Sequence, residues 1–369
     1  MNTTTAALQS IPAAARIGPG QSRQHGGCAS GTDSDVVTMP DPGACVSSGP
    51  TRRRMRRIGA AARIAAVGRP PLGRGQGGGL LASSCRSEWT THYREEASHV
   101  HTYRIGRDVT VLNDQVEVPG LGFLPVNAFV LHAAQPVVID TGLGLPDRDF
   151  VGTLGAVLDP ADVRWIWLTH PDRDHTGGLF DLLDAAPRAR LITTFLGVGI
   201  MSTERPLPLD RVYLLNPGQS LDVGDRALHA FRPPLFDNPA TVGFYDDRSR
   251  TCFSSDCFGA PLPTAELAGG TDARDVPADD LRAAQLLWAA VDSPWVHTAN
   301  TDRYRQTIRS LQSLDPQVIL SSHLPAATGL GTKFLDMLAA APETDPFIGP
   351  DQQALQHLLA GFEPGTTTA

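Results

Sequence analysis

The ten residues Thr169–Gly178, THPDRDHTGG, place two histidines, two aspartates and an arginine between His170 and His175. The apolar run VRWIWL comes directly before them, and a glycine pair ends them. A solvated loop would account for one or two of these ionisable groups. In an H-x-D-x-D-H turn, alternate side chains converge, and a helix opened by the glycines directs its N-terminal dipole at the anionic cluster. The stretch therefore predicts a metal site at the end of a strand.

Three more apolar runs end in an ionisable residue. Asp140 follows VVI, Asp256 follows CFSS, and His323 follows VILSS. Rigid scaffolds display functional groups on the loops at strand ends. Four core strands that end in this way indicate one shared metal or catalytic site. Trp165 and Trp167 have the spacing of a strand face and are predicted to be core residues.

Strand-like and helix-like segments alternate after about residue 95. The strand-like runs are 127–132, 136–140, 163–170, 189–194, 227–231, a hairpin of 241–245 and 251–256, and 317–323. The helix-like segments are 178–186, 279–291 and 302–314. Hairpins that give way to alternating strands and helices favour layered sheets with helices outside.

Composition divides the chain into three parts. Residues 1–95 are rich in Gly, Ala, Ser, Pro and Arg, and they are predicted to be a disordered leader or an extension from a misplaced start codon. Residues 96–340 are the expected folded domain, and 341–369 the expected C-terminal helix and tail. Residues 1–90 hold 11 basic and four acidic residues, whereas the remainder holds 20 and 35. The acidic folded part argues against nucleic acid as a partner.

The sequence also bears on location and on the minor candidates for a site. No run of about 18 apolar residues occurs, so neither a transmembrane helix nor a membrane partner is expected. The five cysteines contain no C-x-x-C pair, which argues against a disulfide framework and a thiolate metal site. A cytoplasmic location is expected. Cys252 and Cys257 are predicted to be packing residues, and His229 and His297 structural histidines.

At this point a family resemblance is visible. The ten-residue stretch resembles the H-x-H-x-D-H signature of the metallo-β-lactamase superfamily, with Asp172 in place of the second histidine. VVIDTG, FSSDCFG and ILSSH resemble the three further motifs of that superfamily, in the same order. The acidic second position and the stretch Ser254–Gly259 are most similar to the flavodiiron, or oxygen-binding diiron, branch. The resemblance covers residues 100–330 and implies an α/β fold, a four-layered αβ/βα sandwich of the metallo-β-lactamase type.

The resemblance also implies two metal sites bridged by one aspartate. The implied ligands are His170, Asp172 and Asp237 for the first metal, Asp174, His175 and His323 for the second, and Asp256 as the bridge. Asp174 and Asp256 are also the predicted catalytic residues. Asp237 departs from the pattern, because the diiron branch has a histidine at the corresponding position. Asp140 is expected to orient a ligand without binding metal.

The donor set bears on the metal and on the reaction. Four carboxylates cancel the charge of two divalent ions, and hard oxygen ligands favour iron or manganese over zinc. Iron is the favoured metal, with zinc and manganese as alternatives. The first functional hypothesis is an enzyme, a metal-dependent hydrolase that attacks a small-molecule substrate with metal-activated water.

Two alternatives stand beside the hydrolase. One is a diiron oxidoreductase acting on dioxygen or nitric oxide. It would need a separate electron-donor protein, because only 46 residues follow His323 and rubredoxin-like cysteine pairs are missing. The other is a non-enzymatic metal-binding sensor. Dimers are common in this superfamily, so a homodimer is possible, and the sequence leaves the oligomeric state open.

Overall fold

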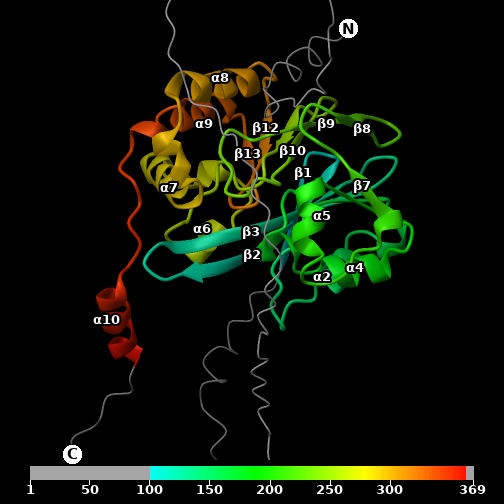
Figure 1. Ribbon diagram of the computed structural model, residues 1–369, viewed down its shortest axis with the longest axis horizontal. Coiled ribbons are helices and arrows are strands. Elements are labelled where there is room, and N and C mark those ends of the chain that lie inside the picture. Colours follow the sequence, from blue (N-terminus) through cyan, green and yellow to red (C-terminus); the bar gives the residue numbers. More distant parts are fainter. Residues whose placement is uncertain (1–99, 363–369) are drawn as a thin grey trace, which may run out of the picture. The chain divides into compact units, whose positions relative to one another are not determined.

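The computed structural model describes residues 100–362, so the leader predicted for residues 1–95 lies outside the described residues. This part of the chain holds two β-sheets with helices on their outer faces (Figure 1). None of its helices combines the length and hydropathy that a membrane span requires.

The first sheet has seven strands that lie in chain order. Strands β1 to β4 are antiparallel, and β4 to β7 are parallel. The strands are β1 His101–Ile105, β2 Val109–Val118, β3 Gly122–Leu131, β4 Val137–Ile139, β5 Trp165–Trp167, β6 Arg190–Thr193 and β7 Val212–Leu214. At Gly122 the backbone has φ +111°, and a Cβ would lie 2.4 Å from the carbonyl oxygen of Leu262. Glycine therefore allows the start of β3 to pair with the segment around Leu262.

The second sheet has six strands in the order β13-β12-β11-β10-β9-β8. Only the β11–β12 pair is parallel. The strands are β8 Ser220–Asp222, β9 Ala227–Phe231, β10 Gly243–Asp246, β11 Thr251–Phe253, β12 Val318–Leu320 and β13 Ala327–Thr328. The hairpin expected at residues 241–256 is thus confirmed as β10 and β11.

The two sheets pack face to face around a buried core. Phe129 and Trp167 from the first sheet meet Phe244 and Phe253 from the second. Both tryptophans predicted to be core residues are buried. Alternating strand residues place one set of apolar side chains in this interface and the other set under the helices.

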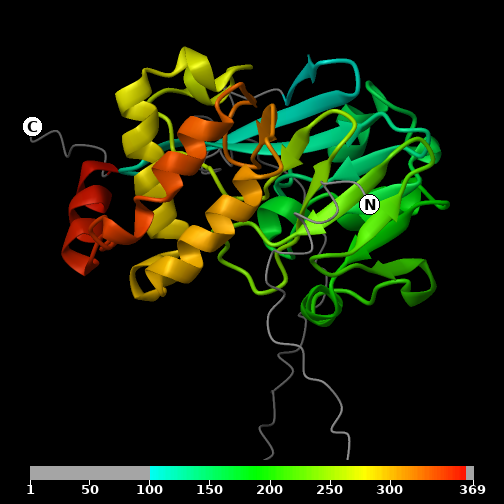
Figure 2. The ribbon, with the colours of Figure 1, turned by 90° about the horizontal axis from the view of Figure 1, so that it is seen from above.

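Helices cover both outer faces, which makes four layers (Figure 2). Side chains of α2 and α4 pack on the first sheet, and those of α7, α8 and α9 pack with the second. The helices are α2 Phe150–Gly155, α3 Arg173–Thr176, α4 Leu179–Ala185, α5 Phe195–Met201, α6 Ala265–Ala268, α7 Ala278–Asp292, α8 Thr301–Gln312, α9 Gly331–Leu338 and α10 Gln352–Phe362. Short 3-10 turns are η2 Pro160–Asp162, η3 Leu209–Arg211, η4 Ala273–Asp275, η5 Pro294–Thr298 and η6 Ala341–Glu343. The four-layered α/β prediction is confirmed.

Candidate metal centre

The strand ends identified in the sequence meet at one place. Asp140 directly follows β4, while His170, Asp256 and His323 lie three residues beyond the ends of β5, β11 and β12. All four side chains are buried. Because β4 pairs in parallel with β5, and β11 with β12, these loops leave both sheets at the same edge.

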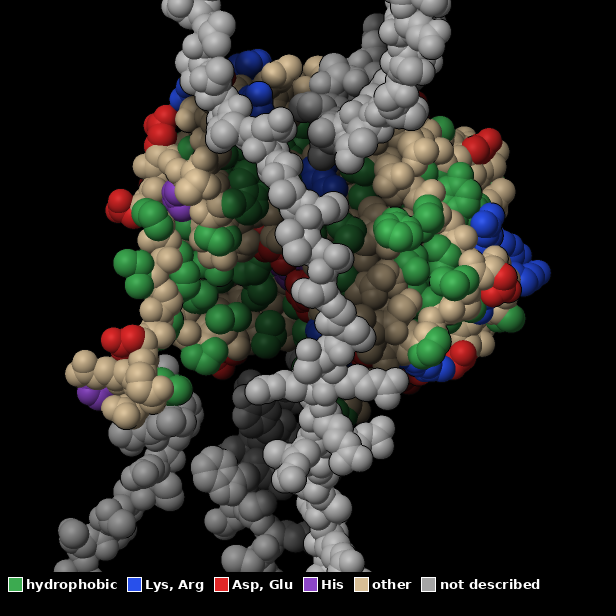
Figure 3. Space-filling view, viewed as in Figure 1, with side chains coloured by type: hydrophobic (Ala, Val, Ile, Leu, Met, Phe, Trp, Pro, Cys, Tyr) green, Lys and Arg blue, Asp and Glu red, His purple; other side chains and the backbone are tan. Residues whose placement is uncertain are grey.

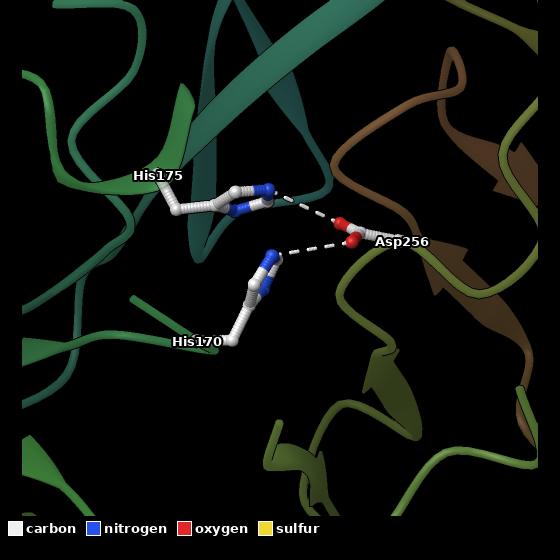
Figure 4. A group of neighbouring side chains, drawn as sticks. All are labelled: His170, His175 and Asp256. Atoms are coloured by element: carbon white, nitrogen blue, oxygen red, sulfur yellow. Dashed lines mark ion pairs between the residues drawn. The ribbon is translucent and has the colours of Figure 1, made fainter. Parts of the chain in front are cut away.

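Asp256 is the centre of the cluster. Its Oδ2 lies 3.3 Å from His170 Nε2, and its Oδ1 lies 3.1 Å from His175 Nε2 (Figure 4). Asp256 Oδ1 and His175 Nε2 are buried without a hydrogen-bond partner among the described residues. Buried polar atoms without partners are costly, so their convergence is the arrangement expected around a cation.

The other predicted ligands lie on two sides of Asp256. Asp174 Oδ2 is 3.5 Å from His175 Nε2 and 3.4 Å from His323 Nε2. On the opposite side, the Oδ2 of Asp172 and the Oδ1 of Asp237 each lie 3.8 Å from His170 Nε2. The ligand atoms of each group lie within 4.8 Å of one another. The structure therefore brings together all seven residues that the sequence nominated.

The outer nitrogen of each histidine has its own partner. His175 Nδ1 lies 2.9 Å from Asp140 Oδ2, His170 Nδ1 lies 3.1 Å from Ser255 Oγ, and His323 Nδ1 lies 2.8 Å from the carbonyl oxygen of Pro125. A carbonyl or carboxylate can only accept, so Nδ1 of His175 and of His323 carries the proton. Their Nε2 lone pairs are then free for a metal.

Asp140 is held by more than His175. Its Oδ1 accepts a hydrogen bond from the backbone N–H of Thr169 at 2.8 Å, and its Oδ2 accepts from the hydroxyls of Thr169 and Ser322 at 2.9 and 3.3 Å. Asp140 lies in the left-handed region with φ +54°, as do Ser255 at +55° and Phe258 at +73°. Strained backbone of this kind concentrates at functional sites, where the surrounding structure holds it.

The glycine pair precedes a helix, as expected, and it also allows a close approach of the backbone. Helix α3 begins at Arg173, inside the ten-residue stretch, and α4 begins after Gly178. A Cβ on Gly177 would lie 2.2 Å from the backbone nitrogen of Gly144, and one on Gly178 would lie 2.7 Å from Phe150 Cβ. The pair therefore lets the stretch pack closely on the segment after β4.

The carboxylates shift one another's ionisation. Burial and the charges of Asp256 and Asp172 raise the pKa of Asp237 to about 7. Burial also acts to raise the pKa of Asp256, but the charges of His170, His175 and His323 outweigh it and hold that pKa well below its usual range. Without a cation, the cluster keeps one carboxylate charged at the expense of another. The ion pairs of the predicted carboxylate ligands involve histidines and no lysine or arginine of residues 100–362. The orphaned atoms and the donor set thus fit two metal ions.

One acidic neighbour was missed by sequence reasoning. Asp292, the last residue of α7, places a carboxylate oxygen within 4.8 Å of ligand atoms of Asp237 and Asp256. No motif marks it, because it ends an amphipathic helix rather than a strand. Its burial and the charges of Asp256 and Asp237 raise its pKa to about 8.

The remaining minor candidates have structural surroundings. His229 contacts Ser220 Oγ at 2.9 Å and Asp247 Oδ2 at 3.4 Å, outside the cluster. Cys252 and Cys257 are buried free thiols, as expected for packing residues. His297, on η5, is the exception: it was expected to be a satisfied structural histidine, but its Nε2 is buried without a hydrogen-bond partner among the described residues.

A largely apolar cavity borders the loop that carries Asp237. It has a volume of about 890 Å³, and its lining includes Phe236, Trp295 and Leu196. Trp295 Nε1 donates to the carbonyl oxygen of Phe236 at 2.7 Å and so ties η5 to this loop. Leu196 belongs to α5, which also carries the exposed Phe195 and Ile200. Hydrophobic side chains gather over the region of α5 in Figure 3. The surface beside the candidate centre is therefore apolar.

Known proteins share both the sequence pattern and the fold. The family model of the metallo-beta-lactamase superfamily matches residues 121–323, more than half of the chain. An anaerobic nitric oxide reductase flavorubredoxin of Salmonella typhi is 27% identical over 134 residues, which are 36% of this chain and 28% of that protein. The type A flavoprotein fprA of Rhodobacter capsulatus is 31% identical over 137 residues, 36% of this chain and 32% of that protein.

Solved structures agree on the fold. The rubredoxin oxygen:oxidoreductase of Desulfovibrio gigas has a TM-score of 0.56 at 17% identity, over 67% of this chain and 63% of that chain. The flavodiiron protein of Giardia intestinalis has a TM-score of 0.58 at 15% identity, over 67% and 60%. The chain spans about a third of the length of the two curated relatives and under two thirds of these structures. By its family match, the chain belongs to the metallo-β-lactamase superfamily, and its sequence and structural neighbours lie in the flavodiiron branch.

Proposed function

We propose that the chain binds two iron ions and acts as a diiron oxidoreductase on a small substrate such as dioxygen or nitric oxide. The observation that carries this proposal is the donor set, in which three carboxylates and three imidazoles surround one buried aspartate, Asp256. The proposed ligands are His170, Asp172, Asp174, His175, Asp237, Asp256 and His323. The names of the relatives, a nitric oxide reductase and an oxygen oxidoreductase, support the same class of reaction.

Charge separates this proposal from the hydrolase hypothesis. A hydrolytic centre needs excess positive charge, because that charge acidifies the bound water. Four carboxylates leave none over two divalent ions, and they hold the net charge of the centre to +2 when both irons are oxidised to the trivalent state. Hard oxygen donors also favour iron and manganese over the softer zinc pattern. The oxidoreductase alternative therefore comes first here, and the hydrolase remains the competing outcome of the experiment.

The residues of the chain would hold and orient the reacting group. The Nε2 atoms of His170, His175 and His323 point into the cluster because their outer nitrogens are engaged. Asn238 Nδ2 donates to Asp172 Oδ1 at 2.9 Å and leaves the other oxygen free for a metal. Bound iron would supply the change of oxidation state. The apolar cavity suits a small uncharged substrate, and the electrons would come from a donor protein.

The experiment combines metal analysis with two assays on the full chain. We expect two irons per chain, an optical band that changes with oxygen, and consumption of dioxygen or nitric oxide with a chemical reductant. His170→Ala and Asp256→Ala should lose metal, while the matched control His229→Ala should keep it, because His229 lies outside the cluster. Two zincs per chain with phosphoesterase or lactonase turnover would replace the proposal with the hydrolase.

A further inference from the structure

Helix α7 turns one face toward the loop that carries Asp256. Gln285 Nε2 donates to the carbonyl oxygen of Phe258 at 3.1 Å, and Trp288 Nε1 donates to that of Asp256 at 3.1 Å. Asp292 lies four residues beyond Trp288, on the same face of the helix. Two hydrogen bonds thus fix the helix whose last residue points a carboxylate at the centre.

The carboxylate of Asp292 lies among other acidic groups. Ser293 Oγ donates to its Oδ2 at 2.9 Å, and it forms no ion pair with an arginine or lysine of residues 100–362. Its other near neighbours are the carboxylates of Asp237 and Asp256, with all three ligand atoms within 4.8 Å of one another. Three negative charges in a partly desolvated site repel one another strongly unless a cation lies among them.

A separate observation points to the same cation. Asp256 is 3% exposed, and its Oδ2 lies 3.3 Å from His170 Nε2, the atom that also lies 3.8 Å from carboxylate oxygens of Asp172 and Asp237. The group formed by Asp237, Asp256 and Asp292 shares Asp237 with the group formed by His170, Asp172 and Asp237. A single ion could therefore be reached from both groups.

We propose that Asp292 is an additional ligand of the first metal, beside His170, Asp172, Asp237 and Asp256. It would give this ion a further oxygen ligand beside Asp237, which stands where the diiron branch has a histidine, and it would make the first site richer in oxygen than the second. This assignment rests on the proposed two-metal centre and is independent of the reaction carried out there.

The test compares Asp292→Asn with Asp280→Asn in the full chain. Asp280 lies on the same helix, is exposed, and is remote in sequence from the residues of the cluster. Metal-free proteins are titrated anaerobically with Fe²⁺, and separately with Mn²⁺, against a competing chelator. We expect Asp292→Asn to bind the weaker of its two ions at least tenfold less tightly than the wild type, and Asp280→Asn to match the wild type.

The melting temperature of Asp292→Asn should differ from that of the wild type in opposite directions in the metal-free and metal-bound proteins. Without metal, Asp292→Asn should melt at a higher temperature than the wild type, because its amide neither repels the carboxylates of Asp237 and Asp256 nor has to take up a proton beside them. With saturating metal, the order should reverse, because a ligand is gone. Equal metal affinity in Asp292→Asn and the wild type, or a lower melting temperature of the metal-free variant, overturns the assignment.

A measurement on the wild-type protein tests the assignment even if Asp292→Asn does not fold. Anomalous diffraction from crystals of the full chain soaked in Mn²⁺ should show an ion within bonding distance of an Asp292 oxygen. Two bound ions that both lie away from Asp292 would overturn this inference and leave the two-metal centre intact. A wild type that binds no metal would overturn both proposals.

Discussion

Replacing Asp140 by asparagine changes one atom of a residue proposed to orient a metal ligand without touching the metal. The asparagine oxygen can still accept from the backbone N–H of Thr169, as Asp140 Oδ1 does at 2.8 Å. Its amide nitrogen then stands where Oδ2 accepts from His175 Nδ1 at 2.9 Å. A hydroxyl can rotate to accept from this amide, but a protonated Nδ1 cannot. His175 must therefore change tautomer, and the proton moves to Nε2, the atom proposed to bind metal.

The size of the effect follows from the lost hydrogen bond. A hydrogen bond to a charged group contributes roughly 1.5–3 kcal/mol. This range corresponds to about 10–100-fold in affinity, the usual cost of losing an outer partner of a metal-binding histidine. We expect Asp140→Asn to bind one ion about 10–100-fold less tightly, measured by chelator competition in the full chain.

Asp246→Asn is the matched control. Asp246 is also 0% exposed and accepts hydrogen bonds from Arg226 at 3.0 Å and Ser249 at 2.6 Å, none of which is a predicted ligand. This variant should lose stability and keep its metal affinity. Equal metal affinity in Asp140→Asn and the wild type would refute the tautomer argument, and so would an equal loss in both variants.

Three further predictions concern stability and metal choice. Burial and neighbouring carboxylates raise the pKa of Asp292 to about 8. Burial acts to lower the pKa of His323, but the charges of Asp256 and Asp174 outweigh it and raise that pKa to about 9. Between pH 7 and 9 both groups bind more protons in the folded than in the unfolded protein. The free energy of unfolding of the metal-free protein should therefore fall by up to about 1.4 kcal/mol per pH unit for each such proton. Denaturant melts measure this, and a free energy of unfolding that rises with pH would contradict it. Gly259→Ala should destabilise the protein by about 1–3 kcal/mol, because the added Cβ would lie 2.6 Å from the indole nitrogen of Trp288. Gly155→Ala is the control and should not destabilise it, because the space around Gly155 is open. Equal melting temperatures of the two variants would contradict this prediction. Asp172→His should raise the ratio of bound zinc to bound iron several-fold in elemental analysis, and an unchanged ratio would show that this carboxylate does not select the metal.

Short-range patterns located most of the regular structure. The strand-like run at residues 227–231 matches β9, and the helix-like segment 302–314 matches α8, whose buried residues include Tyr304, Ile308 and Leu311. The strand-like run expected at residues 127–132 covers only the second part of β3, which begins at Gly122. Its pairing with Leu262 is a contact across more than a hundred residues, which no local pattern reveals.

The same limit applies to the candidate centre. Six of the seven proposed ligands were visible because each lies in the ten-residue stretch or in another quoted motif, and Asp237 was indicated by its correspondence to a histidine of the diiron branch. Asp292 was not visible, since its place beside Asp256 depends on how α7 packs on the loop after β11. Pro125, which accepts from His323, also acts through a backbone carbonyl that any residue could supply. The sequence therefore indicates the site residues that lie in recognisable motifs, and the structure adds those that reach the site only through the packing of distant segments.

Counting the metal ions in the purified full chain tests the central claim most directly. We expect two irons per chain, with both lost or weakened in Asp256→Ala, because Asp256 lies between the two ligand groups. A wild-type chain that takes up one ion or none after anaerobic loading would contradict the two-metal centre. Two ions bound equally well by Asp256→Ala would contradict the bridging role of Asp256.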